Sequence, residues 1–411
     1  MEVLFARCSG LDVHKRSVVA CVRIQHDDGH IEVSRKRFGT TTKELWSLAD
    51  WLVSLNVTQV AMESTGVYWK PVYNILHPAL DVWVVNARHL RQVPGRKTDE
   101  SDAEWIAKLM SYGLLERSFI PEESQRDLRD LTRYRTRLKQ EKSSAANRLH
   151  KILEDANIKL TSVATSIQGV SARLMLEALI ADEQSPEEMA QLAQKRMRSK
   201  IPQLIDALTG QVREHHRFML QELLYQLDSL NQRIEALDQR IAELTEPHAD
   251  LMERLDAITG VGPRTVEVIL AEIGPSVDSW PSAKKLAAWA CVCPGNHESA
   301  GKRKSGKRRK GQKWLVSALV EAAWAASRTK DTYLAAQFHR LRARRGPKRA
   351  AMAVAHSILT IVYHLLDDPT RTFDDLGGDF LLKRNKEQEQ RRAVKTLQTL
   401  GFDVALTPVA A

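Results

Sequence analysis

Strand-length and helix-length patterns of apolar residues alternate along the chain from residue 3 to residue 115. Five segments have the length and the β-branched content of strands: 4–11, 17–24, 31–38, 57–62 and 82–85. The first three follow one another with no helical pattern between them, which predicts an antiparallel meander. Helical periodicity predicts three further elements, at 41–55, 67–77 and 98–112.

The first predicted helix begins with a capping signal. Thr41 and Glu44 fit a capping box, in which the threonine hydroxyl and the glutamate carboxylate satisfy unpaired amides at the helix start. The order of elements is then three strands, helix, strand, helix, strand, helix. Because this order is that of a ribonuclease-H-like (RNase H-like) fold, we expect an α/β domain of this type over residues 1–120.

Beyond Pro121 the strand patterns end and long, charged helical patterns begin. One stripe of apolar residues has spacings of 3 and 4 in alternation: Leu220, Leu223, Leu227, Leu230, Ile234, Leu237, Ile241 and Leu244. Such a seam predicts a coiled-coil helical arm within residues 121–249. The alternative is a helical hairpin packed within one chain, because similar seams line helical bundles.

A third, all-α region is expected over 250–375, followed by a charged tail at 376–411. It opens with the sequence ITGVGPRT at 258–265, whose glycines expose backbone amides that could bind phosphate. A plain tight turn between packed helices explains the same glycines. The region closes with an alanine-rich helix from Pro347 to Leu366, so the fold class is α/β plus all-α.

Composition favours a globular protein of several domains. The chain has 411 residues, of which 43% are hydrophobic and 27% charged. We find no apolar run of the roughly 18 residues that a membrane span needs, and no signal-peptide pattern, so a cytoplasmic location without membrane contact is expected. The four cysteines are expected to be reduced core thiols: Cys8, Cys21, Cys291 and Cys293.

The formal net charge of +10 is concentrated in one place. Seven of the nine residues at 302–310 are Lys or Arg, and their glycine-interrupted pattern favours a flexible loop that binds nucleic-acid phosphates. A solvated surface is the alternative. The predicted nucleic-acid-binding residues are Lys302, Arg303, Lys304, Lys307, Arg308, Arg309, Lys310 and Lys313. Tyr68 and Trp69 could stack on bases, but core positions are the preferred interpretation.

Four acidic residues have the placement of a metal site. Asp12 and Glu63 stand at the ends of the first and fourth predicted strands, while Asp99 and Asp102 are three apart on a predicted helix and would share a face. Hard divalent cations such as Mg²⁺ need several oxygen ligands of this kind. Singly, each residue could instead be a helix cap or a surface acid.

Three motifs carry a resemblance to a known family. GLDVHK at 10–15, MESTGVYW at 62–69 and VPGRKTDESDA at 93–103 resemble the N-terminal domain of the IS110 family of insertion-sequence transposases, a domain similar to RuvC resolvase. The resemblance implies a RuvC-like domain whose acidic tetrad binds Mg²⁺ through Asp12, Glu63, Asp99 and Asp102.

The segment PGNHESAGK at 294–302, followed by KGQKWL at 310–315, resembles the C-terminal transposase domain of the same family. The resemblance implies a nucleophilic serine in a Ser-x-Gly element, which Ser299 matches. Ser305 precedes a glycine in the same stretch, so both serines stay candidates, with Ser299 preferred. From the residues alone, a serine that only hydrogen-bonds within the loop is the more common case.

Family resemblance further implies a transposase that joins donor and target DNA through a covalent serine intermediate. It implies dimers that pair into a tetramer at synapsis, and a structured bridge RNA that selects the DNA by base pairing. Because the serine and the tetrad are about 200 residues apart in the sequence, the site could form within one protomer or be shared between protomers. The alternatives are a metal-dependent junction nuclease that uses water, or a non-enzymatic nucleic-acid-binding protein.

Overall fold

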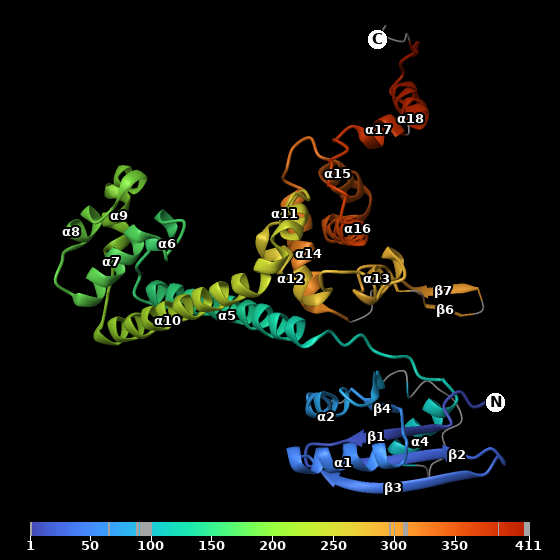
Figure 1. Ribbon diagram of the computed structural model, residues 1–411. Helices are drawn as coiled ribbons and strands as arrows, with labels where there is room; N and C mark the ends of the chain where they lie inside the picture. The colour runs from blue at the N-terminus through green and yellow to red at the C-terminus, as the bar shows by residue number, and fades with distance from the viewer. Residues whose placement is uncertain are drawn as a thin grey trace. The chain divides into compact units, whose positions relative to one another are not determined.

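A computed structural model describes residues 2–64, 66–87, 90, 101–295, 297–299, 301–306, 311–384 and 386–406. The chain divides into two compact units, Met1–Ile120 and Pro121–Ala411 (Figure 1). Each unit has its own core and is considered separately below.

The first unit is built on a five-stranded sheet. Its strands are β1 (Arg7–Val13), β2 (Ser17–Gln25), β3 (Ile31–Gly39), β4 (Gln59–Glu63) and β5 (Asp81–Val85). Their order across the sheet is β3-β2-β1-β4-β5, with β1, β2 and β3 antiparallel and with β4 and β5 parallel to β1. The predicted meander and the ribonuclease-H-like order are confirmed.

Helices cover both faces of this sheet. Leu11 of β1 and Met62 of β4 share a buried core with helices α1 (Thr42–Ser54) and α2 (Trp69–Leu76). On the other face, Cys8 of β1 packs in a separate cluster with helix α4 (Asp102–Ser111). Alternate residues of a strand point to opposite faces, so the two clusters follow from the period of two in the sequence.

The start of α1 differs in one detail from the predicted capping box. The Thr41 hydroxyl accepts a hydrogen bond from the Glu44 amide at 3.4 Å, as expected. The Glu44 carboxylate instead accepts from the amide of Gly39, at 3.1 Å. It therefore ties the helix start to the end of β3 rather than to the cap residue itself.

The second unit begins with two long helices, α5 (Glu123–Asp155) and α10 (Glu214–Thr245), that pack along each other (Figure 1). They are antiparallel, because Asp155 at the end of α5 pairs with His216 at the start of α10, while Arg135 pairs with Asp238. The shorter elements between them are α6 (Leu160–Val163), α7 (Val170–Ala181), α8 (Pro186–Gln191), η1 (Lys195–Lys200) and α9 (Ile201–Leu208).

The apolar seam of α10 faces α5 of the same chain. Leu220, Leu227 and Leu230 are buried in one cluster with Leu138 and Leu149 of α5. The seam therefore packs as the intrachain hairpin that we weighed as the alternative. A coiled coil between chains stays a prediction.

The rest of the second unit is helical apart from one short β-hairpin. Its elements are η2 (Glu246–His248), α11 (Ala249–Asp256), α12 (Pro263–Glu272), α13 (Ala283–Trp289), β6 (His297–Ser299), β7 (Lys302–Ser305), α14 (Lys313–Ala326), α15 (Tyr333–Arg345), α16 (Pro347–Asp367), α17 (Phe380–Arg384) and α18 (Lys386–Thr399). The expectation of a flexible cationic loop over 302–310 is wrong for 302–305, which form strand β7 and pair with β6.

Helix α16 is the one described helix that is long and apolar enough to cross a membrane, with 56% of its most apolar window buried inside the protein. Polar residues interrupt its sequence, among them His356, Ser357 and His364, so it is not a continuous apolar run. Val354, Ile358 and Leu359 are fully buried, and the Tyr363 hydroxyl donates to the Trp280 carbonyl at 3.1 Å. These contacts are those of a core helix.

Candidate carboxylate site and serine hairpin

Asp12 and Glu63 lie side by side at the carboxyl ends of two neighbouring parallel strands. The register pairs Leu11 of β1 with Met62 of β4, so the next residues along are Asp12 and Glu63. Leu11 and Met62 point into the α1 and α2 face. Successive residues of a strand alternate in direction, so both carboxylates are placed on the opposite face, which α4 covers.

Gly10 allows α4 to lie directly against β1. A Cβ at Gly10 would be 2.1 Å from the Ala103 carbonyl oxygen and 2.4 Å from the Ala107 nitrogen. Arg35 of β3 forms an ion pair with Glu104 in the first turn of the same helix. These contacts hold the first turn of α4 on the face of the sheet to which Asp12 and Glu63 belong.

Asp102 is the first residue of α4, and the helix start differs from the prediction. Ser101 is the N-cap, with an extended backbone, and its hydroxyl accepts from the Glu104 amide at 3.3 Å. The predicted helix from residue 98 is therefore wrong at Ser101, which the prediction placed inside the helix. Asp99 itself lies outside the described residues.

Asp12 already has one polar neighbour. Its Oδ2 lies 3.0 Å from Nε2 of His14, and its side chain is 27% exposed against 59% for His14. A carboxylate that is half-buried at a sheet edge stays open to a ligand while one oxygen is held in place. His14 is a neighbour that the motif search did not single out as a site residue.

The carboxylates present have the chemistry of a site for Mg²⁺, which prefers oxygen ligands. The described donors are Asp12, Glu63 and Asp102. Within the described ranges, no group of three or more His, Cys, Asp and Glu side chains is close enough together to hold a metal ion. The donor types fit the ion, and the predicted set requires Asp99 in addition.

The two candidate serines occupy different ends of the β6–β7 hairpin. Ser299 pairs with Lys302 beside the turn, where Gly301 adopts a φ of +72° that favours glycine. Ser305 pairs with His297 at the other end. The serine of the Ser-x-Gly element is thus the one next to the turn.

The predicted nucleic-acid-binding residues divide into three groups. Lys302 is an exposed residue of β7, and Arg303 and Lys304 follow it in the same strand. Lys313 is the first residue of α14, with its Nζ 4.6 Å from the centre of the Trp314 ring. The other four lie outside the described residues: Lys307, Arg308, Arg309 and Lys310.

The two glycines of the 258–265 turn differ in their surroundings. Gly260 has a φ of +82°, and a Cβ there would be 2.4 Å from the Ala322 carbonyl oxygen of α14. Close packing therefore explains this glycine. Gly262 has open space around it and is the N-cap of α12, so phosphate binding at this helix start stays a prediction.

The expected core position is wrong for Tyr68. This side chain is 40% exposed, and its neighbour Val67 is 63% exposed. Trp69 is partly buried against the core of the first unit, edge-on to Tyr73 with 5.9 Å between ring centres. The two aromatic side chains of the motif thus differ in burial, because helix α2 begins at Trp69, directly after Tyr68.

Sequence reasoning missed a set of buried charges in the second unit. Arg135 of α5 is 2% exposed and pairs with Asp238 of α10 and with Glu267 of α12. Arg133 donates to both oxygens of Glu272, at 2.7 and 2.8 Å. The available signal was a polar residue, Arg135, within the otherwise apolar repeat of α5.

Two family models match the chain. Residues 9–158 match a model of the DEDD, IS110 type, described as a transposase. Residues 252–340 match a model described as "Transposase IS116/IS110/IS902 family". The first match contains Asp12, Glu63, Asp99 and Asp102, and the second contains Ser299 and Ser305.

A curated relative has the same description. The protein named "Putative transposase y4pF/y4sB" from Sinorhizobium fredii (strain NBRC 101917 / NGR234) is 26% identical over 277 residues, which are 66% of this chain. The match spans 62% of the relative's length. With two family models matching separate parts of the sequence, the chain belongs to the IS110 family of transposases.

Proposed function

We propose that this chain is a DNA transposase that cuts and rejoins strands to move an insertion sequence. The observation that carries the proposal is the adjacency of Asp12 and Glu63 at the ends of parallel strands, on the face where α4 begins with Asp102. Membership of the transposase family supports the same class of reaction.

In this proposal Asp12, Glu63, Asp99 and Asp102 hold Mg²⁺. When bound there, the ion supplies a positive charge that stabilises negative charge on phosphoryl oxygens during strand cleavage. The chain's own contribution is to fix the carboxylates. The packing of α4 against Gly10 places Asp102, and the parallel register places Asp12 beside Glu63.

Ser299 is the proposed nucleophile. Its oxygen bonds to the phosphorus of a DNA phosphodiester, and the bond from phosphorus to the 3′ oxygen breaks. The proton lost by the serine balances the proton taken up by the 3′ oxygen, which leaves as a hydroxyl. A 3′ hydroxyl of another DNA end then attacks the 5′-phosphoserine, which rejoins the strand and frees the serine.

The test is capture of this covalent species. Purified protein is incubated with donor DNA labelled at the 3′ end of the cleaved strand, and the product is resolved under denaturing conditions. A 5′-phosphoserine keeps the 3′ label on the protein and releases a 5′ label. We expect Ser299→Ala to abolish the labelled protein and Ser305→Ala, the matched control from the same hairpin, to retain it.

Two other outcomes would contradict the proposal. Undiminished cleavage by Ser299→Ala would identify a metal nuclease that uses water. Unchanged strand transfer by Asp102→Asn would show that Asp102 takes no part in the reaction, whereas DNA binding without strand transfer by the wild-type protein would leave a non-enzymatic role. Asp50→Asn, an exposed acid on α1, serves as the charge-matched control for Asp102→Asn.

We also propose that a bridge RNA selects donor and target DNA and that the protein acts as a homo-oligomer, a dimer that pairs into a tetramer. The basic character of 302–313 supports a second nucleic-acid partner. RNA that co-purifies with the protein should contain one enriched, structured species. RNA that matches the total cellular pool in composition would overturn this part.

A further inference from the structure

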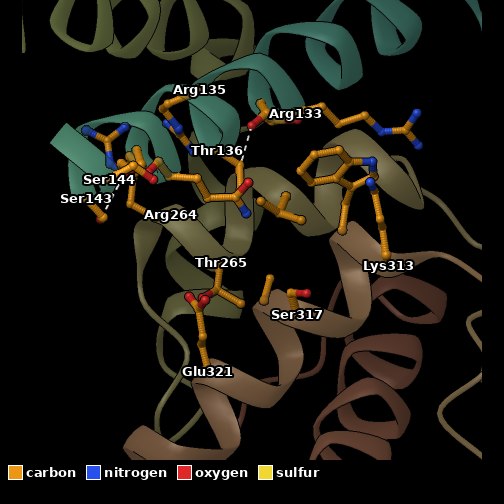
Figure 2. Close-up of a pocket in the computed structure, with 16 residues that line it drawn as sticks. Arg133, Arg135, Thr136, Ser143, Ser144, Arg264, Thr265, Lys313, Ser317 and Glu321 are labelled. Carbon is orange, nitrogen blue, oxygen red and sulfur yellow. Dashed lines mark hydrogen bonds between the residues drawn. The ribbon is translucent and has the colours of Figure 1, made fainter. Parts of the chain in front are cut away.

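A polar cavity lies within the second unit, between helices α5, α12 and α14. Its volume is about 630 Å³, which is within the usual range of ligand pockets. In Figure 2 the side chains of α5 lie on one side of this space and Ser317 and Glu321 of α14 lie on the other. The cavity is therefore framed by three helices of one compact unit.

Basic residues outnumber acidic ones in the lining. Glu321 is the acidic residue there, and the basic ones are Arg133, Arg135, Lys139, Arg264 and Lys313. The three arginines pair with carboxylates of the second unit: Glu272 for Arg133, and Asp238 and Glu267 for Arg135 and Arg264. The two lysines form no ion pair with any described carboxylate.

The surroundings of Lys139 oppose its positive charge. Loss of water around the ammonium and the nearby Arg135 lower the pKa of Lys139, against the opposing attraction of Asp238 and Glu267. A bound anion would offset both the loss of water around the Lys139 ammonium and its repulsion by Arg135. The cavity thus has an incompletely compensated cation on α5.

Trp314 links the α14 side of the cavity to α5. The Lys313 Nζ lies 4.6 Å from the centre of its ring, and the Arg137 guanidinium lies 5.7 Å from it. Contacts of this kind hold cations by the electrostatics of the aromatic ring. One tryptophan therefore holds a cation from each helix at the same edge of the cavity.

The basic surface continues along α5. A second cavity of about 360 Å³ shares Gln140 and Ser144 with the first and adds Arg137 and Arg148, with Glu141 as its acidic residue. Arg137, Gln140, Ser144 and Arg148 are spaced by 3, 4 and 4 residues and so lie on one face of the helix. We call the two connected cavities the α5 groove.

The α5 groove adjoins the serine hairpin along the chain. Strand β7 ends at Ser305, and α14 begins at Lys313, which lines the groove. Trp314 adds an aromatic ring to the basic lining of the groove. Basic grooves with aromatic residues are a common way to bind single strands.

We propose that the α5 groove binds the phosphodiester backbone of a single-stranded DNA segment, with Lys139 and Lys313 on successive phosphates. This inference rests on the proposed function, which makes DNA the substrate of the neighbouring serine. The side-chain hydroxyls of Thr265 and Ser317 supply further donors for phosphate oxygens. Trp314 positions two of the cations.

The test measures binding of a labelled single strand to the full-length protein by fluorescence anisotropy across a salt series. Lys139→Gln with Lys313→Gln should weaken binding by about fivefold or more. Each phosphate contact on a single strand contributes about 0.7 to the slope of log affinity against log salt, so that slope should fall by about 1.4. Lys151→Gln, an exposed lysine of α5 outside the groove, is the matched control.

Three results would overturn the inference: unchanged affinity and slope in the double variant, a loss confined to duplex DNA, or tighter binding of an RNA strand of the same sequence. Arg137→Gln with Arg148→Gln gives an independent check at exposed positions and should also lower the slope. The measurements use Ser299→Ala protein without divalent metal. If the groove does not bind the strand, this binding assay shows it. If the proposed function is wrong, the wild-type protein gives no covalent product in the separate capture assay.

Discussion

Gly10 lies where strand β1 meets helix α4, and its missing side chain sets how closely the two approach. The Ala103 carbonyl and the Ala107 amide occupy the space that a Cβ would need. Both alanines are fully buried. The motif glycine therefore acts through packing, and its effect on the carboxylates is indirect, through the position of Asp102 at the start of the helix.

Gly10→Ala should destabilise the protein by about 3 kcal/mol and reduce strand transfer, because the helix must move away from the sheet. Urea unfolding and the covalent-capture assay measure the two effects. Gly262→Ala is the control, since that glycine has an extended backbone and open space; it should cost less than about 1 kcal/mol. Equal stability of Gly10→Ala and wild type would contradict the packing argument.

The cysteines show how burial controls reactivity in the same units. All four are free thiols, as expected, with Cys8, Cys21 and Cys291 buried and Cys293 partly exposed. Burial raises the pKa of Cys8 to about 12 and that of Cys21 to about 11, from an ordinary 9.0. Because the pKa of each thiol is higher in the folded state, both thiols are neutral in either state below pH 9 and the protein keeps its full free energy of unfolding there. As the pH rises from 9 toward 11 and 12, the thiols ionise more readily in the unfolded chain, and the free energy of unfolding falls.

At pH 8 we expect one thiol of the native protein to react rapidly with a disulfide reagent and four to react after unfolding. Only thiolates attack, and buried thiols stay protonated. Cys293→Ser should remove the rapid phase. A rapid phase of two or more thiols in the wild-type protein would contradict the burial argument.

Between elements, ion pairs and hydrogen bonds join α12 to the helical hairpin. Glu272 is fully buried and accepts from Nε and Nη2 of Arg133, while Arg129 donates to the Ala271 and Glu272 carbonyls at 3.1 and 2.7 Å. Burial lowers the pKa of Arg129 to about 10, and Glu272 opposes that change. Removal of the carboxylate would take away the ion pairs that Arg129 and Arg133 form with Glu272.

Glu272→Ala should therefore lower the free energy of unfolding by about 3–5 kcal/mol. Urea denaturation followed by circular dichroism measures the change. Glu243→Ala breaks an exposed pair with Arg240 and should cost less than about 1 kcal/mol. Similar losses for the two variants would show that the buried position of Glu272 adds nothing.

For the molecule as a whole, the candidate chemistry is divided between the two compact units. The carboxylates belong to Met1–Ile120 and the serine hairpin to Pro121–Ala411. The two family models match the chain on either side of residues 159–251. In the proposed reaction, residues from both units act on one phosphodiester.

If protomers share sites, a mixture of Asp102→Asn and Ser299→Ala proteins should regain strand transfer that neither has alone. In mixed oligomers one site then combines an intact tetrad with an intact serine. Asp12→Asn mixed with Asp102→Asn is the control and should stay inactive, because every tetrad is defective. If the mixture of Asp102→Asn and Ser299→Ala proteins is as inactive as each protein alone, a shared site is excluded.

Local pattern by itself determined the layout of the first unit. Strand alternation and helical periodicity depend on near neighbours, so the strand order and the end positions of Asp12 and Glu63 could be predicted. Residues at the carboxyl ends of neighbouring parallel strands lie at the same edge of the sheet. Ser299 follows from resemblance to a Ser-x-Gly element and not from local pattern, and its role stays a proposal.

Only the tertiary structure decided what covers each apolar face and where segments end. The heptad seam of α10 could be predicted from the sequence, but its packing partner, α5 of the same chain, could not. Periodicity shows that a helix has an apolar stripe and does not show which element packs against it. The Ser101 cap, the hairpin at 297–305 and the pairing of Arg135 with Asp238 and Glu267 depend on contacts distant in sequence or on competing local bonds. Such contacts are fixed by folding as a whole, and local sequence does not encode them.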